Sequence, residues 1–450
     1  MNANFYLQCK TCLKILRIRV QAGYYNWIPF TYECPECKVV CRGEITIPSQ
    51  VSPEEKRHNP VMGNLKNCFH IKESDVGQNN TVGVLQLSSE LYTEKITKDE
   101  GIFHLFAHLT PHLQYASSAI NTETLQNLVT EILKEIYDKE DDYTAFWDLY
   151  ENSSSYLRKK KKQRGVEKRR KKYLNENQKI GFLQDYLYKQ IRKSDYYITS
   201  SDNILSKLKI IRKKKHVEFQ KLAQIINDNF DKSTKKIFTV TSNFLNYYNY
   251  ILPVILNEIS QTYVINDIKD RLGMAQTDFE FLKTPYSENY EDLKDFIWIL
   301  ILINNIYYRD KIENFNPDFE TGFKSNTVEK IKEDITKFNS QIRNVGNRKI
   351  ILNYDDTQIT INKVFDNEIR NSIDHRDYTY NYNEQLISFN NKDTPKRMYL
   401  IEFSDNLFQG FILANILWDV MMYIAINQKG LVLRLILKGG TILWMNCIQE

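Results

Sequence analysis

The apolar residues of this 450-residue chain recur with two different spacings. Over residues 1–50 they form short β-rich runs separated by turns, which is typical of strands in a small ribbon-like module. Beyond residue 176 they recur at the three- and four-residue spacing of amphipathic helices. The two patterns predict an α+β protein. The helices are expected near residues 122–137, 178–193, 203–229, 236–261, 288–308, 327–344 and 360–375.

Alternation of apolar and polar residues returns between residues 380 and 403, and it predicts a β-hairpin inserted into the helical region. A final helix is expected over residues 404–427. Much of this helix is apolar and long enough to raise the question of a membrane span. It contains three polar residues that would be costly in lipid, namely Gln409, Asn415 and Asp419. We therefore expect a buried helix and no membrane partner.

Changes in composition divide the chain into six segments. We expect a ribbon module (1–50), a mixed α/β region (51–150), a basic linker (151–175), a helical region (176–284), a mainly α domain (285–428) and an apolar tail (429–450). The net charge of +5 is modest, but the basic residues are concentrated in residues 158–172 and in a second run. The second run contains Lys207, Lys209, Arg212, Lys213, Lys214 and Lys215. Such clusters suit the phosphate backbone of RNA, and nearby tyrosines either stack bases or pack in the helical core.

The first residues lack the basic start, apolar run and cleavage site of a secretory signal, so we expect a cytoplasmic protein. Thiols stay reduced in that compartment, and paired cysteines are then better explained as metal ligands than as disulfides. Cys9 and Cys12 form one Cys-x-x-Cys pair, and Cys34 and Cys37 form a second. This spacing predicts a zinc ribbon with four thiolate ligands.

Four thiolates close the coordination sphere of zinc, so the ion is expected to be structural, with no metal required for catalysis. The basic residues of the module suit either nucleic acid or plain solvation. They are Lys10, Lys14, Arg17, Arg19, Lys38 and Arg42. Cys41 is a spare ligand that would compete for the ion. A second metal candidate comprises His104, His108 and His112, but Pro111 would break their helix, which favours ordinary structural histidines.

The segment 361–376 places two kinds of side chain on opposite sides of a helix. Its apolar stripe comprises Ile361, Phe365, Ile369 and Ile373. On the other side, Arg370 precedes Asp374 by four residues and Asn371 precedes His375 by four, which predicts one exposed polar patch.

The string RNSIDH at residues 370–375, followed by the alternating aromatic segment from Tyr378, resembles the HEPN domain of prokaryotic ribonucleases and toxins. The resemblance covers residues 285–427 or so and implies a four-helix core. It implies that Arg370 and His375 are catalytic and that Asn371 supports them. It also implies a toxin or effector of anti-phage defence by abortive infection. Residues 347–355 look like a decayed, non-catalytic second copy.

Histidine can take a proton from a ribose 2′-hydroxyl, and arginine can neutralise the charge that grows on the phosphate. One imidazole cannot easily act on both sides of the phosphorus, so we expect a homodimer with a composite cleft. RNA is then the substrate, with 2′,3′-cyclic phosphate and 5′-hydroxyl ends, and a phage-derived trigger or an antitoxin is a further expected partner. Two alternatives stay open: a non-catalytic zinc-ribbon protein that binds nucleic acid or acts as a sensor and dimerises through its helical domain, and a zinc hydrolase built on the histidines at 104–112.

Overall fold

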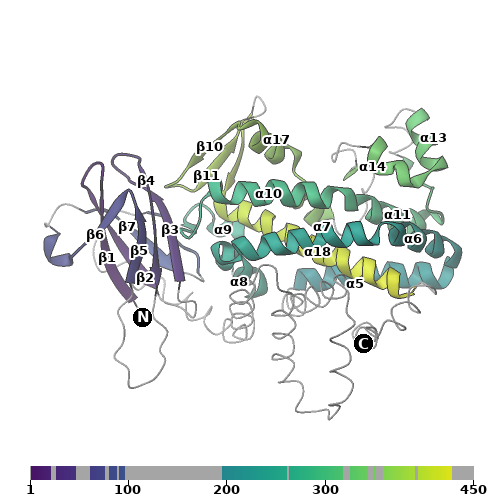
Figure 1. The fold of residues 1–450 in the computed structure, drawn as a ribbon, viewed down its shortest axis with the longest axis horizontal. Helices are drawn as coiled ribbons and strands as arrows, with labels where there is room; N and C mark the ends of the chain where they lie inside the picture. Colours follow the sequence, from purple (N-terminus) through teal and green to yellow (C-terminus); the bar gives the residue numbers. More distant parts are fainter. Residues whose placement is uncertain are drawn as a thin grey trace, which may run out of the picture. The chain divides into compact units, whose positions relative to one another are not determined.

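We describe a computed structural model of the whole chain (Figure 1). The structure describes residues 2–21, 27–46, 61–76, 81–88, 91–96, 195–260, 263–317, 325–342, 348–349, 358–390 and 394–427. Several expected features lie outside these ranges: the helices near 122–137 and 178–193, the basic run at 158–172, the three histidines at 104–112 and the tail at 429–450.

The protein is α+β, as predicted, and it forms two compact units that are each discontinuous in sequence. Unit 1 comprises Met1–Asn127, Phe244–Ser287 and Glu368–Phe408, and unit 2 comprises Leu128–Asn243, Glu288–Asn367 and Gln409–Glu450. The expected division at residues 284 and 285 falls inside one helix, α10 (Phe279–Leu293). Consecutive segments of the chain are therefore not separate domains here.

The β-rich part of unit 1 is larger than the expected ribbon of residues 1–50. The four strands predicted there are present as β1 (Asn2–Cys9), β2 (Ile15–Gln21), β3 (Trp27–Glu33) and β4 (Val40–Thr46). Three later strands, β5 (Val61–Lys66), β6 (Cys68–Ile71) and β7 (Thr81–Ser88), complete two sheets with the orders β6-β1-β2-β7 and β3-β4-β5. The boundary at residue 50 is thus wrong, because β1, β2 and β4 take their hydrogen-bonding partners from beyond it.

One apolar core holds these two sheets together. Its fully buried members include Leu7, Ile18 and Phe30 from the early strands and Leu87 from β7. Side chains of this kind contribute about 1.5–3 kcal/mol each when they leave water. The later strands therefore supply apolar surface as well as hydrogen bonds.

The rest of unit 1 contains several helices and two further sheets, and the larger of these sheets lies beside α17 (Figure 1). The helices include α8 (Leu252–Ser260), α9 (Ile265–Ile268), the start of α10, α17 (Asn367–His375) and the start of α18 (Leu400–Asn427). The predicted hairpin is in fact a three-stranded antiparallel sheet with strands β10 (Tyr378–Asn381), β11 (Leu386–Phe389) and β12 (Lys396–Tyr399). The run at residues 398–403 was misassigned because its second half is already the helix α18. A short pairing of β8 (Thr93–Glu94) with β9 (Leu272–Gly273) links distant segments of the same unit.

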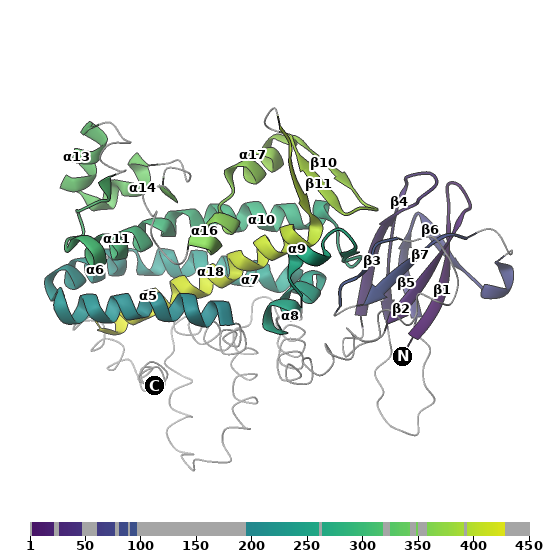
Figure 2. The same cartoon turned by 180° about the vertical axis from the view of Figure 1, so that it is seen from behind.

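Unit 2 is helical, and several of its helices are shorter than predicted. The expected helix at 203–229 is α5 (Asp195–Lys214) followed by α6 (His216–Asp228). The one at 236–261 is α7 (Phe230–Tyr247), a 3-10 turn and then α8, which belongs to unit 1. The 288–308 range holds the end of α10, a 3-10 turn and α11 (Ile297–Arg309). The 327–344 range holds α13 (Ser325–Glu333), a 3-10 turn and α14 (Phe338–Gln341). In Figures 1 and 2, α5, α6 and α11 lie side by side.

The expected helix at 360–375 is interrupted and forms α16 (Gln358–Val364) and α17. Phe365 and Asp366 separate the two helices, and aspartate before a helix is favoured because its carboxylate can accept bonds from the free backbone N–H groups. Phe365 still lies in the core with no exposed surface. The apolar stripe was therefore correct, although the helix that carries it is not continuous.

The last helix, α18, begins four residues earlier than predicted, at Leu400. It is long and apolar enough to cross a membrane by composition, and 94% of the window that meets this test is buried inside the protein. A core helix meets the same test. Helices occupy all four ranges that the HEPN resemblance implies, while the specific four-helix arrangement stays a prediction.

Candidate functional site

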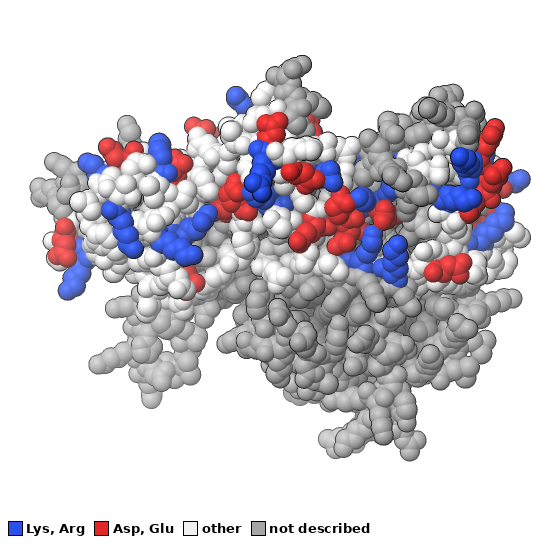
Figure 3. Space-filling model, turned by 45° about the horizontal axis from the view of Figure 1, so that its top comes forward, with Lys and Arg blue, Asp and Glu red and all other residues white. Residues whose placement is uncertain are grey.

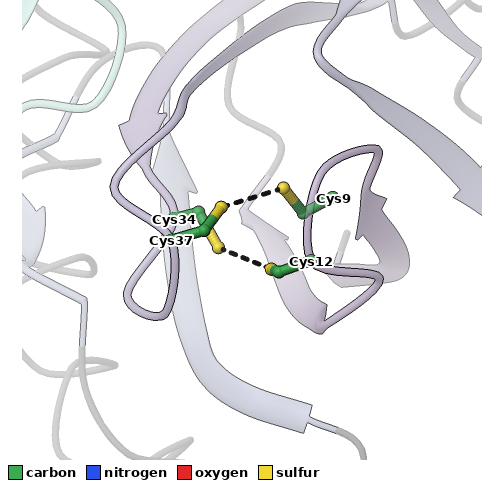
Figure 4. A group of neighbouring side chains, drawn as sticks. All are labelled: Cys9, Cys12, Cys34 and Cys37. Atoms are coloured by element: carbon green, nitrogen blue, oxygen red, sulfur yellow. Dashed lines mark hydrogen bonds between the residues drawn. The ribbon is translucent and has the colours of Figure 1, made fainter.

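The four predicted zinc ligands lie together in unit 1. All four sulfur atoms of Cys9, Cys12, Cys34 and Cys37 lie within 4.8 Å of one another. The Sγ atoms of Cys9 and Cys37 are 3.5 Å apart, as are those of Cys12 and Cys34 (Figure 4). Thiolates around a tetrahedral zinc ion with Zn–S bonds of about 2.3 Å would lie roughly 3.8 Å apart. The cluster therefore fits a tetrahedral metal ion with only small adjustments.

Two equivalent turns present these sulfurs. In the first, Leu13 N–H donates to Cys9 O at 3.0 Å and Cys9 N–H donates to Lys14 O at 2.9 Å. In the second, Lys38 N–H donates to Cys34 O at 3.0 Å and Cys34 N–H donates to the oxygen of Val39 at 2.9 Å. Leu13 and Lys38 both have left-handed backbones, with φ values of 60° and 64°. This repeated conformation, unfavourable for residues other than glycine, is what holds the two Cys-x-x-Cys pairs face to face.

The turns also favour the thiolate form of the first ligand. Burial opposes ionisation of Cys9, but N–H groups of Cys12 and Thr11 point at its sulfur and lower its pKa to about 7. Burial raises the pKa of Cys34 to about 12, as expected for a sulfur whose neighbours are other thiols. A bound cation would offset the cost of burying a charged sulfur, because it stabilises the thiolate directly.

The other candidates of the module have different surroundings. The Cys41 thiol points at the carbonyl oxygens of Val39 and Asn67, 3.8 and 3.6 Å away, and it is not part of the four-sulfur group. Arg42 is paired with the buried Asp278 at 2.8 Å, and Lys38 lies 3.5 Å from Glu33. Part of the predicted basic surface is thus already neutralised within unit 1.

The helix α17 carries the three predicted catalytic residues. Ile369 and Ile373 are buried, with 0% and 9% exposure, and they fix one side of the helix to the core. Asn371 and His375 are exposed on the other side. The side chain of Arg370 is 31% exposed. The polar patch predicted from helical spacing is therefore open to solvent.

Arg370 is held in place by its neighbours on the same helix. Its guanidinium lies 3.0 Å from a carboxylate oxygen of Asp374, an ion pair at the i, i+4 spacing. The same Nη1 atom donates to the side-chain oxygen of Asn371 at 3.3 Å. Asn371 therefore helps to orient the guanidinium. An exposed pair of this kind is weak, so a phosphate could displace Asp374 at small cost.

His375 is the last residue of α17, and a two-bond motif terminates the helix there. Arg376 has a left-handed φ of 58°, Arg376 N–H donates to Ile373 O at 3.2 Å, and Asp377 N–H donates to Ser372 O at 2.8 Å. This is the hydrogen-bond pattern of a Schellman cap. The backbone under His375 is thereby fixed while its ring remains exposed.

Tyr378, just after this cap, contacts two charged residues from α10. Its hydroxyl accepts a short hydrogen bond from the Lys283 ammonium and lies 3.4 Å from the Glu280 carboxylate. Lys283 and Glu280 also pair with each other at 2.6 Å. Sequence reasoning missed this group, because 95 residues separate Lys283 from Tyr378. The spacing of Glu280 and Lys283 on one helix was the only local signal.

Arg348, the arginine of the supposed second copy, is structural. Its side chain is 2% exposed, and it donates to Ile342 O and to Lys294 O, each at 2.7 Å, with Asp295 3.3 Å away. A guanidinium held by carbonyl oxygens in this way cannot reach an external phosphate. The residues described at this position thus agree with a non-catalytic segment.

Comparisons of the chain with known protein families, with curated proteins and with solved structures find no match. The resemblance to HEPN domains is consequently carried by the motif at residues 370–375. Function has to be inferred from the chemistry of the four-cysteine cluster and of α17.

Proposed function

We propose that the protein is a metal-independent RNA endonuclease of the HEPN type, in which Arg370 and His375 are the catalytic residues and Asn371 orients the arginine. The observation that carries this proposal is the presentation of α17: its apolar side is buried, its C-terminal cap is fixed, and the same short helix offers an exposed imidazole and a guanidinium held by Asp374. The zinc ion of the ribbon has a structural role in this proposal. It would hold the two sheets of unit 1 at the two cysteine turns.

The reaction needs only groups that two copies of this helix offer. One imidazole removes the proton of a ribose 2′-hydroxyl, the 2′-oxygen attacks the adjacent phosphorus, and the bond from phosphorus to the 5′-oxygen breaks. A second, protonated imidazole gives its proton to the departing 5′-oxygen. The products are a 2′,3′-cyclic phosphate and a 5′-hydroxyl. Arg370 would neutralise the charge that develops on the phosphate oxygens.

Two imidazoles on opposite sides of the phosphorus require two copies of α17, so the active form would be a homodimer that joins its exposed patches. A nuclease that is not inhibited would degrade the RNA of its own cell. A toxin or abortive-infection effector of anti-phage defence, held back by an antitoxin or released by a phage-derived trigger in the cytoplasm, is the setting that fits this chemistry.

Expression in a growing bacterium tests the proposal. Wild type should arrest growth and produce cellular RNA fragments with cyclic phosphate ends, whereas His375→Ala should do neither. His70→Ala is the matched control, because His70 is also exposed but lies on β6, and it should behave like wild type. Equal toxicity and equal RNA fragmentation by wild type and His375→Ala would contradict the assignment.

The four-cysteine cluster favours a second candidate function. A zinc ribbon that binds nucleic acid, or senses a partner, could use the helical regions only for dimerisation. This candidate predicts that His375→Ala keeps full biological activity, while loss of Cys34 abolishes it.

A further inference from the structure

The end of α5 and the end of α11, both in unit 2, form a surface with an unusual combination of groups. Tyr308, near the end of α11, is 50% exposed, and two aliphatic side chains of the α5–α6 region, Ile210 and Val217, are 39% and 69% exposed. Four cations of α5 are also exposed: Lys209, Arg212, Lys213 and Lys214. On the face of the molecule shown in Figure 3, acidic and basic side chains of the described residues are interspersed.

A buried lysine contacts one face of the Tyr308 ring. The ammonium of Lys207, a residue only 5% exposed, lies 5.4 Å from the Tyr308 ring centre and 5.8 Å from that of Tyr307. The two tyrosine rings are perpendicular, with centroids 4.8 Å apart. A cation on one face of an aromatic ring is attractive, so the ring is supported on its inner side and open on its outer side.

The two helix ends are also tied together. The ammonium of Lys215, at the junction of α5 and α6, donates to Ile306 O at 2.6 Å and to Tyr307 O at 2.8 Å, and it pairs with Asp310 at 2.7 Å. Lys207, Ile210 and Lys214 follow one another at the three- and four-residue spacing of a single helix face. The exposed Lys214 is therefore on the side of α5 that meets the tyrosines.

Helix stability alone does not account for this surface. Arg212, Lys213 and Lys214 stand in the last turn of α5, where cations interact favourably with the helix dipole. That effect gives no reason for Lys209, which lies earlier, or for a supported aromatic ring left half in solvent. Stacking surfaces bordered by cations are the means by which proteins bind single-stranded nucleic acid, since every base has a flat face and every phosphate a charge.

We infer that Tyr308, supported by Lys207 and flanked by Lys214 on the same side of α5, is a binding platform for single-stranded RNA that continues to Lys209 and Lys213 farther round that helix. A base stacks on the outer face of Tyr308, and adjacent phosphates lie against the exposed lysines. The choice of RNA over DNA rests on the proposed function. The binding itself does not depend on Arg370 or His375.

Binding of a fluorescent oligouridine of about twenty nucleotides tests this inference, with full-length protein that carries His375→Ala so that the probe stays intact. Tyr308→Ala should weaken binding about tenfold, and Tyr308→Trp should restore it, because stacking needs only an aromatic face. Replacing Lys209, Lys213 and Lys214 by Gln should weaken binding further and reduce the slope of log Kd against log salt by roughly two. Two matched controls should leave the affinity unchanged: Phe281→Ala, an aromatic residue 42% exposed in unit 1, and Lys330→Gln, an exposed lysine in the last turn of α13.

Three results would overturn the platform. The first is that the protein with His375→Ala alone does not bind the probe, and the second is that adding Tyr308→Ala leaves its affinity unchanged. The third is that the variant with Gln at positions 209, 213 and 214 binds the probe as tightly as Lys330→Gln does. Binding to vesicles of phosphatidylserine and phosphatidylcholine through Tyr308, without RNA binding, would assign the surface to membranes and reject it for RNA. The two proposals fail separately. If the protein binds RNA through Tyr308 but never cleaves it, only the nuclease proposal is contradicted. If the protein cleaves RNA but Tyr308→Ala does not change its affinity, only the platform is contradicted.

Discussion

Arg348 is the clearest case of a buried charge whose contacts explain its presence. It donates to two carbonyl oxygens and faces Asp295, which Lys236 also contacts at 2.7 Å. Burial alone would raise the pKa of Asp295, but hydrogen bonds and charge from Lys236 and Arg348 lower it. A carboxyl whose folded pKa is lowered stabilises the fold above its unfolded pKa, and this contribution is lost as the pH falls through the folded value.

Arg348→Ala should therefore lower the free energy of unfolding by about 3 kcal/mol, because it leaves carbonyl oxygens and part of a carboxylate without a donor. Urea denaturation at neutral pH measures this difference. The gap in stability between wild type and variant should narrow as the pH falls from about 4, the ordinary aspartate value, through the lower folded pKa at which Asp295 is protonated in wild type. Arg397→Ala, at an exposed arginine of β12, is the control and should change stability by less than about 0.5 kcal/mol. An equally small effect of Arg348→Ala would show that the residue is not buried as described.

At the scale of elements, the two cysteine turns lie where two sheets of unit 1, β6-β1-β2-β7 and β3-β4-β5, meet. Cys9 ends β1 of one sheet, and Cys34 directly follows β3 of the other, so one ion would join them. Structural zinc contributes about 10 kcal/mol or more to small domains that fold around it. Part of that contribution should be replaced here by the shared apolar core.

Metal removal tests this role. Cys37→Ser changes a partly exposed ligand with little effect on the core, and it should abolish binding of one zinc ion per chain and cost on the order of 5 kcal/mol. Native mass spectrometry measures the metal, and hydrogen exchange of β1 to β4 measures the stability. Cys41→Ala, in the same core but outside the sulfur cluster, should keep the ion. A metal-free chain with unchanged exchange rates would refute the structural role.

Local patterns predicted some elements well and others poorly, for physical reasons. The strands β1 to β4 and the cluster of Cys9, Cys12, Cys34 and Cys37 followed from alternation and spacing, which are properties of neighbours in sequence. The partner strands β5 to β7 could not be predicted in this way, because pairing between distant strands produces little local pattern in the sequence of either strand. The interruption at Phe365 was likewise missed, because that residue continues the apolar stripe across the gap between two helices.

The same limit applies to the candidate sites. Exposure of Arg370, Asn371 and His375 followed from helical geometry, and the Arg370 pair with Asp374 is an i, i+4 contact. The support of Tyr308 by Lys207 joins residues about a hundred positions apart, so only the structure reveals it.

At the scale of the whole molecule, the chain combines a β module with a four-cysteine cluster, a basic and aromatic surface, and a helix that carries Arg370 and His375. In the proposed function, RNA binds at the second feature and is cleaved at the third. Because each of the two compact units draws on distant segments of the chain, no single boundary separates them. Experiments on function therefore need the full chain.

Single-turnover cleavage of RNA by the purified full-length protein, in EDTA, tests the central claim most directly. Wild type and His70→Ala should cut RNA to products with cyclic phosphate ends and leave the same sequence intact when every 2′-hydroxyl is methylated. His375→Ala should be slower by a factor on the order of a thousand, since general acid–base catalysis contributes roughly a hundred- to ten-thousandfold. Equal rates for wild type and His375→Ala, or cleavage of the methylated strand, would contradict the account.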